Sequence, residues 1–399
     1  MTSGPPLVAR THDSIASIAA ETWDGLANPD PSRFDPFLSH AFLAALEDAG
    51  CVGPGSGWRA LPISLETADG DVLGLAPTYL KTHSRGEYVF DHAWADALER
   101  AGGRYYPKLQ CAVPFTPVPG RRLLVAPGPE AEHTRRHLAA AAVEVAGRAG
   151  LSSLHITFAT ADEWRDLGAM GFLQRTDQQF HFANPGYRDF EDFLATLASR
   201  KRKAIRRERE EAVANSVTVH ALSGADITES AWDAFFAFYM DTGNRKWGQP
   251  YLNRPFFSLL GERLGERCLL VLASRLGRPI AGALHLIGGD CLYGRYWGAI
   301  EHHPFLHFEL CYYQAIDYAI AQGLPRVEAG AQGDHKIARG YLPATTYSVH
   351  WIADAELAAG VARYLEAERR HVERARDMLA ELAPYRRNGG TAGAAGEGD

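Results

Sequence analysis

The sequence predicts an α/β protein built from two similar units, each an antiparallel hairpin, a helix and a central strand. The chain has 399 residues, more than a single hydrophobic core usually supports. Strand and helix patterns alternate along both halves. Two segments place a Gly-Leu pair at the end of a helix and then begin a strand: AGRAGLSSLHI (146–156) and YAIAQGLPRVE (318–328). This similarity indicates an internal duplication.

The first half provides a hairpin, a loop, a helix and a strand. Apolar stretches at 60–65 and 72–80 flank Asp69-Gly70-Asp71, a combination typical of a β-hairpin. Six prolines between 107 and 129 exclude one regular element there and predict a long ordered loop. Residues 133–149 have helical spacing and stop at a glycine, and residues 154–158 have the pattern of a strand.

The second half repeats this order. Residues 268–274 and 280–287 predict a hairpin, 292–299 a strand, 306–321 a helix, and a further strand begins at Val327. The Asn-Pro-Gly at 184–186 indicates a boundary between strand and helix. We therefore expect one domain at 1–180, a second at 181–387, and a disordered Gly/Ala-rich tail at 388–399.

Composition restricts the classes of function. The net charge of −7 excludes a protein that coats nucleic acid over its whole surface, although a local basic patch remains compatible. No apolar run reaches the roughly 18–20 residues of a membrane span, and no signal-peptide pattern is readable. The five cysteines are far apart and never form a CxxC motif, which favours a reducing cytoplasm over a disulfide framework or a zinc site.

A basic segment is the most unusual part of the chain. Residues 190–212 predict one helix with an apolar stripe, and seven of ten positions from 200 to 209 are cationic: Arg200, Lys201, Arg202, Lys203, Arg206, Arg207 and Arg209. Only Glu208, Glu210 and Glu211 lie within helical reach as partners. The segment is either a solvated helix face or a surface that binds phosphate groups.

Residues 293–350 gather polar groups that could carry out chemistry. The glycine-rich loop EAGAQGDHKIARG (328–340) places an imidazole, His335, beside two cations, Lys336 and Arg339, and we expect Lys336 to be an exposed cation. Glu309 either complements a helix dipole or takes part in catalysis. His307 is a helix cap, a core residue or a catalytic group. No metal is expected, because His307, Glu309, Glu328 and His335 lack the spacing of known metal motifs.

Several long motifs resemble the FemAB-like predicted N-acyltransferases, a peptidoglycan biosynthesis/recognition group within the GNAT superfamily. They are FLSHAFLAALEDAG, YYPKLQCAVPFTPVPGRRLL, SRKRKAIRRERE, KWGQPYL, LYGRYWG, LHFELCYYQAIDYAI and EAGAQGDHKIARGYLPATTYSVHWI. The similarity extends over roughly residues 14 to 386. It implies two tandem GNAT-like domains, each a mixed, mainly antiparallel sheet flanked by helices, and transfer of an acyl or aminoacyl group to an amine, on a cell-wall precursor or a small metabolite.

The acyl donor is a cosubstrate, so no resident cofactor is expected. A CoA-dependent enzyme holds pyrophosphate in a glycine-rich turn before a helix, and neither 121–133 nor 298–310 has such a turn. The missing turn and the basic helix favour aminoacyl-tRNA as the donor. Two alternatives remain, namely a conventional acyl-CoA-dependent N-acyltransferase and a non-catalytic pair of GNAT-like domains that binds RNA or a precursor. The oligomeric state is not predicted.

Acyl transfer to an amine needs a proton acceptor and a group that stabilises the oxyanion. On the resemblance, we expect Lys336 or Arg339 to stabilise the oxyanion or the donor phosphate, and Glu309 or His335 to accept the proton. Tyr296 and Trp297 would line an acceptor channel. The remaining substrate-binding candidates are Arg295, His307 and Glu328, with Lys201, Arg202 and Arg206 on donor phosphates.

Overall fold

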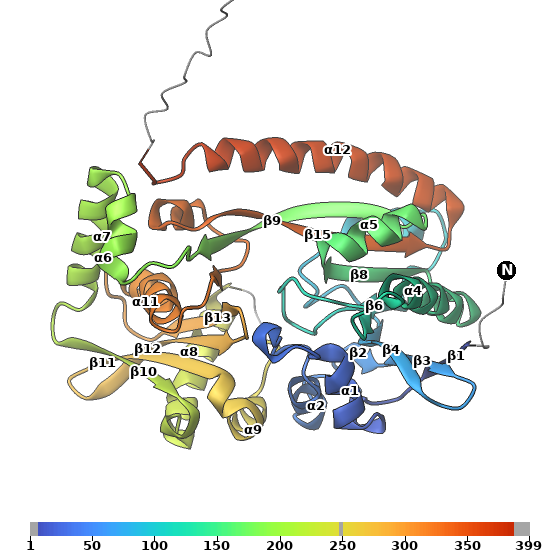
Figure 1. The fold of residues 1–399 in the computed structure, drawn as a ribbon, viewed down its shortest axis with the longest axis horizontal. Helices are drawn as coiled ribbons and strands as arrows, with labels where there is room; N and C mark the ends of the chain where they lie inside the picture. Colours follow the sequence, from blue (N-terminus) through green and yellow to red (C-terminus); the bar gives the residue numbers. More distant parts are fainter. Residues whose placement is uncertain (1–6, 247–249, 387–399) are drawn as a thin grey trace, which may run out of the picture.

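An eleven-stranded sheet runs through the computed structural model, which describes residues 7–246 and 250–386 (Figure 1). Its strands lie in the order β10 (Val217–Ser223), β11 (Cys268–Arg275), β12 (Arg278–Ile287), β13 (Cys291–Ala299), β14 (Arg326–Glu328), β9 (Leu173–Ala183), β15 (Leu342–Ile352), β8 (Ser153–Ala159), β6 (Lys108–Cys111), β5 (Thr78–Lys81) and β2 (Trp58–Ala60). A second sheet contains β1 (Leu7–Thr11), β3 (Ile63–Thr67), β4 (Val72–Ala76) and β7 (Leu124–Val125). The predicted tail at 388–399 and residues 247–249 of KWGQPYL lie outside the described residues.

The same helical connection occurs twice in the large sheet. Its strand pairs are antiparallel except β6–β8 and β13–β14. Parallel neighbours need a long crossover, which is provided by α4 (Ala131–Arg148) in one case. In the other it is a continuous helix made of α10 (Leu306–Phe308), the π-helical turn η5 (Glu309–Tyr313) and α11 (Gln314–Ala321). The predicted hairpins are also confirmed, although β3–β4 belongs to the smaller sheet.

The two units exchange their last strands. β9 follows β8 in the chain but pairs with β14, and β15 follows β14 but pairs with β8. β9 and β15 then pair with each other over nine residues, so the sheet runs unbroken from one half of the chain to the other (Figure 1). The proposed boundary at residue 180 falls inside β9. Two domains at 1–180 and 181–387 therefore remain a proposal about chain organisation.

Helices from both halves also share one core. The elements involved are α1 (Ala20–Ala27), α2 (His40–Asp48), α8 (Glu229–Lys246) and α9 (Arg254–Leu264). Phe42 of α2 and Phe256 of α9 pack edge to face, with ring centroids 5.8 Å apart. The side chains of Ser39 and Asn253 cap the N-termini of α2 and α9, respectively. Apolar burial across this contact fixes the N-terminal helices on the second half.

The expected single helix at 190–212 is wrong. It is divided into α6 (Phe190–Thr196) and α7 (Ser199–Ala212). Leu197 leaves the helical conformation, with ψ 155°, and forms an antiparallel bridge with Tyr385. The backbone N–H of Ala198 then donates to the carbonyl of Pro384 at 2.9 Å. The backbone hydrogen bonds lost by the helix are thus recovered from the C-terminal segment.

Two further findings concern the described residues as a whole. None of the helices within 7–246 and 250–386 is long and apolar enough to cross a bilayer. All five cysteines are free, and Cys311 is only half-buried, whereas the others are buried.

Three buried histidines and the half-buried His181 have pKa values that keep them neutral. Burial lowers the pKa to about 3 in His155 and His181 and to about 4 in His285, and takes that of His350 well below its usual value. His155 and His350 hydrogen-bond through their Nδ1 atoms at 2.7 Å, which joins β8 to β15. Burial also raises the pKa of two carboxyls, Glu87 and Glu328, to about 7.

These groups predict loss of stability in mild acid. Between about pH 5 and 6.5 unfolding lets the four histidines bind protons, whereas the two carboxyls release theirs. The net uptake is up to two protons, so the free energy of unfolding should fall by up to about 2.7 kcal/mol for each pH unit of acidification. Urea unfolding at several pH values measures this slope. Replacing His285 by Phe should reduce it by about 1.4 kcal/mol per pH unit, and a wild-type stability that rises on acidification would contradict the prediction.

Candidate active site

The candidate site lies where β13 and β14 separate. The two strands pair only from Cys291 to Tyr293 and from Arg326 to Glu328. The register of β13 against β12 shifts after Leu284, which leaves Arg295 as an extra residue in β13. Beyond Glu328 the chain enters the 328–340 loop, which contains the short helix η6 (Asp334–Arg339). The loop and the helix at 306–321 therefore meet at the end of this parallel pair.

Lys336 is buried, so the expectation of an exposed cation is wrong. Only 3% of the residue is accessible, and its Nζ donates to the carbonyls of Ala329 at 2.6 Å and Gly330 at 3.1 Å. Burial lowers the pKa of Lys336 to about 8. The helical turn η6 folds the ammonium back onto the start of its own loop. Removing it would therefore affect the loop conformation as well as any chemistry.

Arg339 joins the loop to α7. Its Nη2 donates to Oε1 of Glu208 at 2.8 Å and its Nε donates to Oε2 at 3.1 Å, a two-point contact between guanidinium and carboxylate. The Tyr313 hydroxyl donates to the same carboxylate. The guanidinium also lies 3.4 Å from the centroid of the Phe308 ring. The sequence indicated the loop and the basic segment separately, and this ion pair brings them together.

Glu309 is held by a cation of α7, Arg209. Arg209 donates to Oε1 of Glu309 at 2.9 Å and to Oε2 at 3.1 Å, and it also contacts Asp317 at 2.7 Å. Gln314 donates to Oε1 at 2.7 Å. The carboxylate is buried and both of its oxygens accept hydrogen bonds. This arrangement favours a positioning role for Glu309, and its expected role as the base is still a prediction.

His335 and His307 lie in an aromatic cluster beside the loop. His335 is exposed and its Nε2 is 3.1 Å from the Tyr312 hydroxyl. The ring of His307 lies 6.1 Å from that of His335 and 5.1 Å from that of Trp297. Partial desolvation of the imidazole, together with the nearby cations Arg339 and Lys336, lowers the pKa of His335 below its usual value. His335 is therefore neutral at pH 7, as a proton acceptor must be.

Glu328 is a buried carboxyl at the end of β14 whose pKa is raised. Its Oε1 lies 3.1 Å from Nε of Arg326, whereas its Oε2 is buried with no hydrogen-bond partner among the described residues. Nε2 of His181 lies 3.9 Å from that oxygen and also has no hydrogen-bond partner among the described residues. Burial, with nearby Asp35 and Asp290, raises the pKa of Glu328 to about 7. A carboxyl near half ionisation at neutral pH is suited to proton transfer.

Tyr296 and Trp297 point to opposite faces of β13, because successive residues of a strand alternate. The Tyr296 hydroxyl donates to the carbonyl of Phe115 at 3.3 Å, and Arg295 donates to the same carbonyl at 3.0 Å. Tyr296 packs against the hydrophobic core that contains residues of α2 and α9. Trp297 packs against a different core, which contains residues of α11. These two aromatic residues therefore do not line one common channel.

The cations of α7 divide into two groups. One group has ion-pair partners: Arg206 pairs with Glu191 of α6, Arg207 with Glu211 at the next turn, and Arg209 with Glu309 and Asp317. The other group is at the start of the helix and consists of Arg200, Lys201, Arg202 and Lys203. Within the described part of the chain, these four side chains have no ion pair or hydrogen bond. Lys201 and Arg202 are half-buried, and the other two are exposed. We call these four residues the basic patch.

Three side chains contact the predicted site residues although the sequence did not indicate those contacts. Glu208 was considered only as a neighbour in the helix, and His181 and Tyr312 were not considered. Helical spacing cannot reveal the pairing of Glu208 with Arg339, which are 131 residues apart. Among the described residues, no group of three or more His, Cys, Asp or Glu side chains is arranged to hold a metal ion.

Comparison with known proteins agrees with this architecture. The sequence profile of the FemAB-like family, described as peptidoglycan biosynthesis/recognition, matches residues 14–387. No curated protein sequence matches the chain significantly.

Three solved structures are similar in fold. The crystal structure of FemX has a TM-score of 0.55 and 14% identity, and covers 86% of this chain and 98% of its own. The C-terminal domain of a putative lysylphosphatidylglycerol synthetase from Agrobacterium fabrum has a TM-score of 0.54 and 8% identity, and the match covers 89% of this chain and 97% of that domain. L-PGS from Bacillus licheniformis has a TM-score of 0.50 and 10% identity, and the match covers 84% of this chain and 98% of the L-PGS chain. The predicted fold class, two tandem GNAT-like units with mainly antiparallel sheets, is confirmed.

Proposed function

Because the chain belongs to the FemAB-like family of peptidoglycan biosynthesis/recognition proteins, we propose that it is an N-acyltransferase that moves an acyl or aminoacyl group onto an amine. The acceptor is an amine of a cell-wall precursor or a small metabolite, and the reaction takes place in the cytoplasm. The observation that carries the proposal is the ion pair between Arg339 and Glu208. It joins the polar 328–340 loop to the basic helix α7, which supports a site that uses both.

The reaction requires a neutral amine. The amine nitrogen attacks the acyl carbonyl carbon, a C–N bond forms, and the ester C–O bond of the donor breaks. We assign Glu328 the role of taking the first proton from the acceptor ammonium and later releasing it to solvent. The second proton, which the nitrogen must lose after attack, passes to the leaving alkoxide. Two properties of Glu328 support this role: its Oε2 has no hydrogen-bond partner among the described residues, and its pKa is about 7. His335 remains the second candidate for the proton acceptor, since it is exposed and neutral.

Lys336 is the proposed oxyanion group. An ammonium has three N–H donors, and two of them bind the carbonyls of Ala329 and Gly330. The third is left for the oxygen that becomes negative during attack. Arg339 and Glu309 hold the loop and the 306–321 helix against α7, so we assign them positioning roles.

The basic patch supports a donor with many phosphates, and aminoacyl-tRNA is the donor that we propose. Four contacts between these cations and RNA phosphates would give a slope of about −3 for the logarithm of the affinity against the logarithm of salt concentration. Replacing Lys201, Arg202 and Lys203 by Glu should remove most of this slope. Arg206 is left unchanged because it pairs with Glu191.

Filter binding of total tRNA over a salt series measures the slope. Arg278→Glu is a matched control, because Arg278 is an exposed cation on the β11–β12 hairpin, and it should leave the slope unchanged. A flat slope for the wild type would remove the tRNA donor. Calorimetry with acetyl-CoA completes the test: one-site binding near 1 μM, roughly −8 kcal/mol, would favour acyl-CoA instead.

A further inference from the structure

The last helix, α12 (Ala355–Ala380), covers β9 and β15 (Figure 1), and its fully buried apolar residues lie in its first part. Val361 and Leu365 are buried there. From the next turn onward the side chains that face the sheet include three charged ones, Arg369, Glu373 and Arg376, together with Val372. A helix that packs on a sheet normally presents an apolar stripe. The polar stripe leaves open space between α12 and the sheet.

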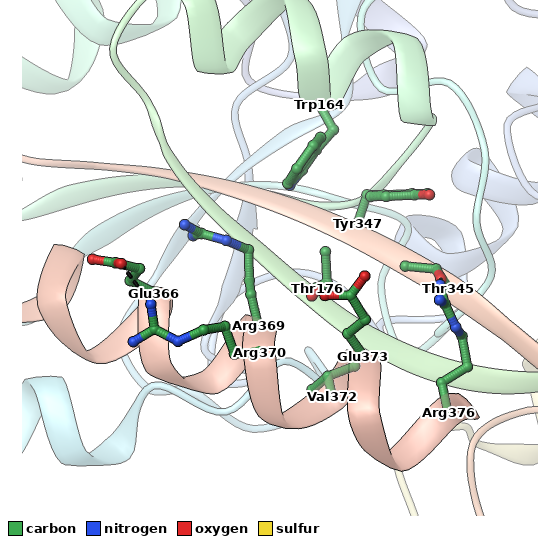
Figure 2. Close-up of a pocket in the computed structure, with 10 residues that line it drawn as sticks. All are labelled: Trp164, Thr176, Thr345, Tyr347, Glu366, Arg369, Arg370, Val372, Glu373 and Arg376. Atoms are coloured by element: carbon green, nitrogen blue, oxygen red, sulfur yellow. Dashed lines mark hydrogen bonds and ion pairs between the residues drawn. The ribbon is translucent and has the colours of Figure 1, made fainter. Parts of the chain in front are cut away.

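This space is a groove of about 380 Å³ (Figure 2). Its floor is formed by Thr176 of β9 and by Thr345 and Tyr347 of β15. One wall is α12, and the opposite wall is Trp164 of α5 (Ala161–Ala169). The volume is in the range of small-ligand sites. None of the proposed active-site residues lines the groove.

The lining of the groove includes two aromatic rings, those of Trp164 and Tyr347, and the hydroxyls of Thr176 and Tyr347. The Trp164 indole N–H donates to the carbonyl of Arg175 at 3.1 Å, so the ring face rather than the N–H is left for a ligand. Its ring lies 5.4 Å from that of Tyr347. Within the described residues, the hydroxyls of Thr176 and Tyr347 have no hydrogen bond. Aromatic faces carry negative charge density that attracts polarised C–H groups.

The charges along the groove alternate in sign. Arg370 pairs with Glu366 at 2.7 Å. Glu373 has no cationic partner among the described residues and lies between Arg369 and Arg376 in the sequence of the helix. Arg369 donates to the carbonyl of Gln174, and Arg376 donates to the Thr345 hydroxyl at 3.1 Å. A polyanion would meet the Glu373 carboxylate, whereas hydroxyl groups can bond to both the guanidinium and the carboxylate groups.

We propose that this groove binds an uncharged carbohydrate chain, with one sugar ring on the face of Trp164 and its hydroxyls bonded to Arg369, Glu373 and Thr176. The groove is separate from the proposed active site and does not depend on the proposed function. A carbohydrate fits better than a nucleic acid because of Glu373.

Calorimetry with the full chain and an N-acetylglucosamine tetramer tests the proposal, with an oligothymidine of similar length as the competing probe. The tetramer should bind saturably, with an affinity that changes little with salt. Trp164→Ala and Arg369→Ala should each weaken binding at least tenfold, whereas Trp164→Phe should retain most of it. Arg374→Ala is the matched control, because Arg374 is an exposed arginine of the same helix that does not line the groove.

Thermal melting establishes whether each variant is folded. If Trp164→Ala does not fold, the proposal is tested with Arg369→Ala. Absence of saturable binding by the tetramer would overturn the proposal. So would unchanged binding in the folded variants, or salt-dependent binding of the oligothymidine that requires Trp164.

Discussion

Replacing Lys108 by methionine is expected to lower the free energy of unfolding by about 3 to 5 kcal/mol. Lys108 is fully buried in the first unit, where it bonds to Glu87 at 2.7 Å, to Ser84 at 2.8 Å and to Asp91. Methionine keeps an unbranched side chain, one atom shorter, but removes the charge. It would leave the buried Asp91 carboxylate without its closest cation, and such a charge cannot recover its hydration.

Two further variants separate charge from packing. Lys203→Met makes the same chemical change at an exposed position of α7 and should alter stability by less than about 0.5 kcal/mol. Adding Asp91→Asn to Lys108→Met removes both members of the pair and should recover part of the loss. Urea unfolding of the four proteins measures the effect. A loss below about 1 kcal/mol for Lys108→Met would contradict the view that this charged cluster holds the first unit together.

The largest expected effect on activity follows from Glu328→Gln, which should lower kcat by about 10²- to 10⁴-fold. A general base works only when it is ionised, and burial raises the pKa of Glu328 to about 7. The wild-type rate should therefore fall as the pH drops below 7 and the carboxyl takes up a proton. The acid limb of the pH–rate profile should be absent in Glu328→Gln, because an amide does not titrate in this range.

The variants Glu309→Gln and His335→Gln identify the titrating group. Glu309 is bonded to Arg209, so its replacement should lower activity without moving the acid limb. The pKa of His335 is lowered, so a limb due to His335 would lie below pH 6.5. If Glu328→Gln retains the wild-type profile and the limb disappears in His335→Gln, the base is His335. Loss of folding in Glu328→Gln, detected by thermal melting, would instead indicate a structural role.

Local patterns in the sequence predicted most of the elements but not how they pair. The helix at 133–149 and the strand at 154–158 correspond closely to α4 and β8, because each has its own apolar spacing and a glycine at the helix end. The exchange of β9 and β15 leaves no local signal, because both strands have the same alternation whichever partner they take. The break at Leu197 depends on Tyr385, 188 residues away, and could not be predicted from helical periodicity.

The sequence indicated which residues belong to the candidate site but not which of them contact one another. The 328–340 loop stood out because glycines and fixed charges are close together in it. Whether Lys336 is buried depends on the fold of η6, which the spacing of the charges does not reveal. Glu328 was named among substrate-binding residues, but its unusual ionisation arises from burial and from Asp35 and Asp290 on distant segments. Such effects belong to the tertiary structure and not to the motif.

Formation of an amide bond tests the proposed function most directly. The full chain is incubated with a mixture of aminoacyl-tRNAs or with acetyl-CoA, together with an amine-bearing cell-wall precursor, and the acceptor is analysed by mass spectrometry. The account predicts an acceptor heavier by one aminoacyl residue, formed only with aminoacyl-tRNA and lost in Lys336→Ala. The same product made equally well by Lys336→Ala, or no amide from either donor, would contradict it.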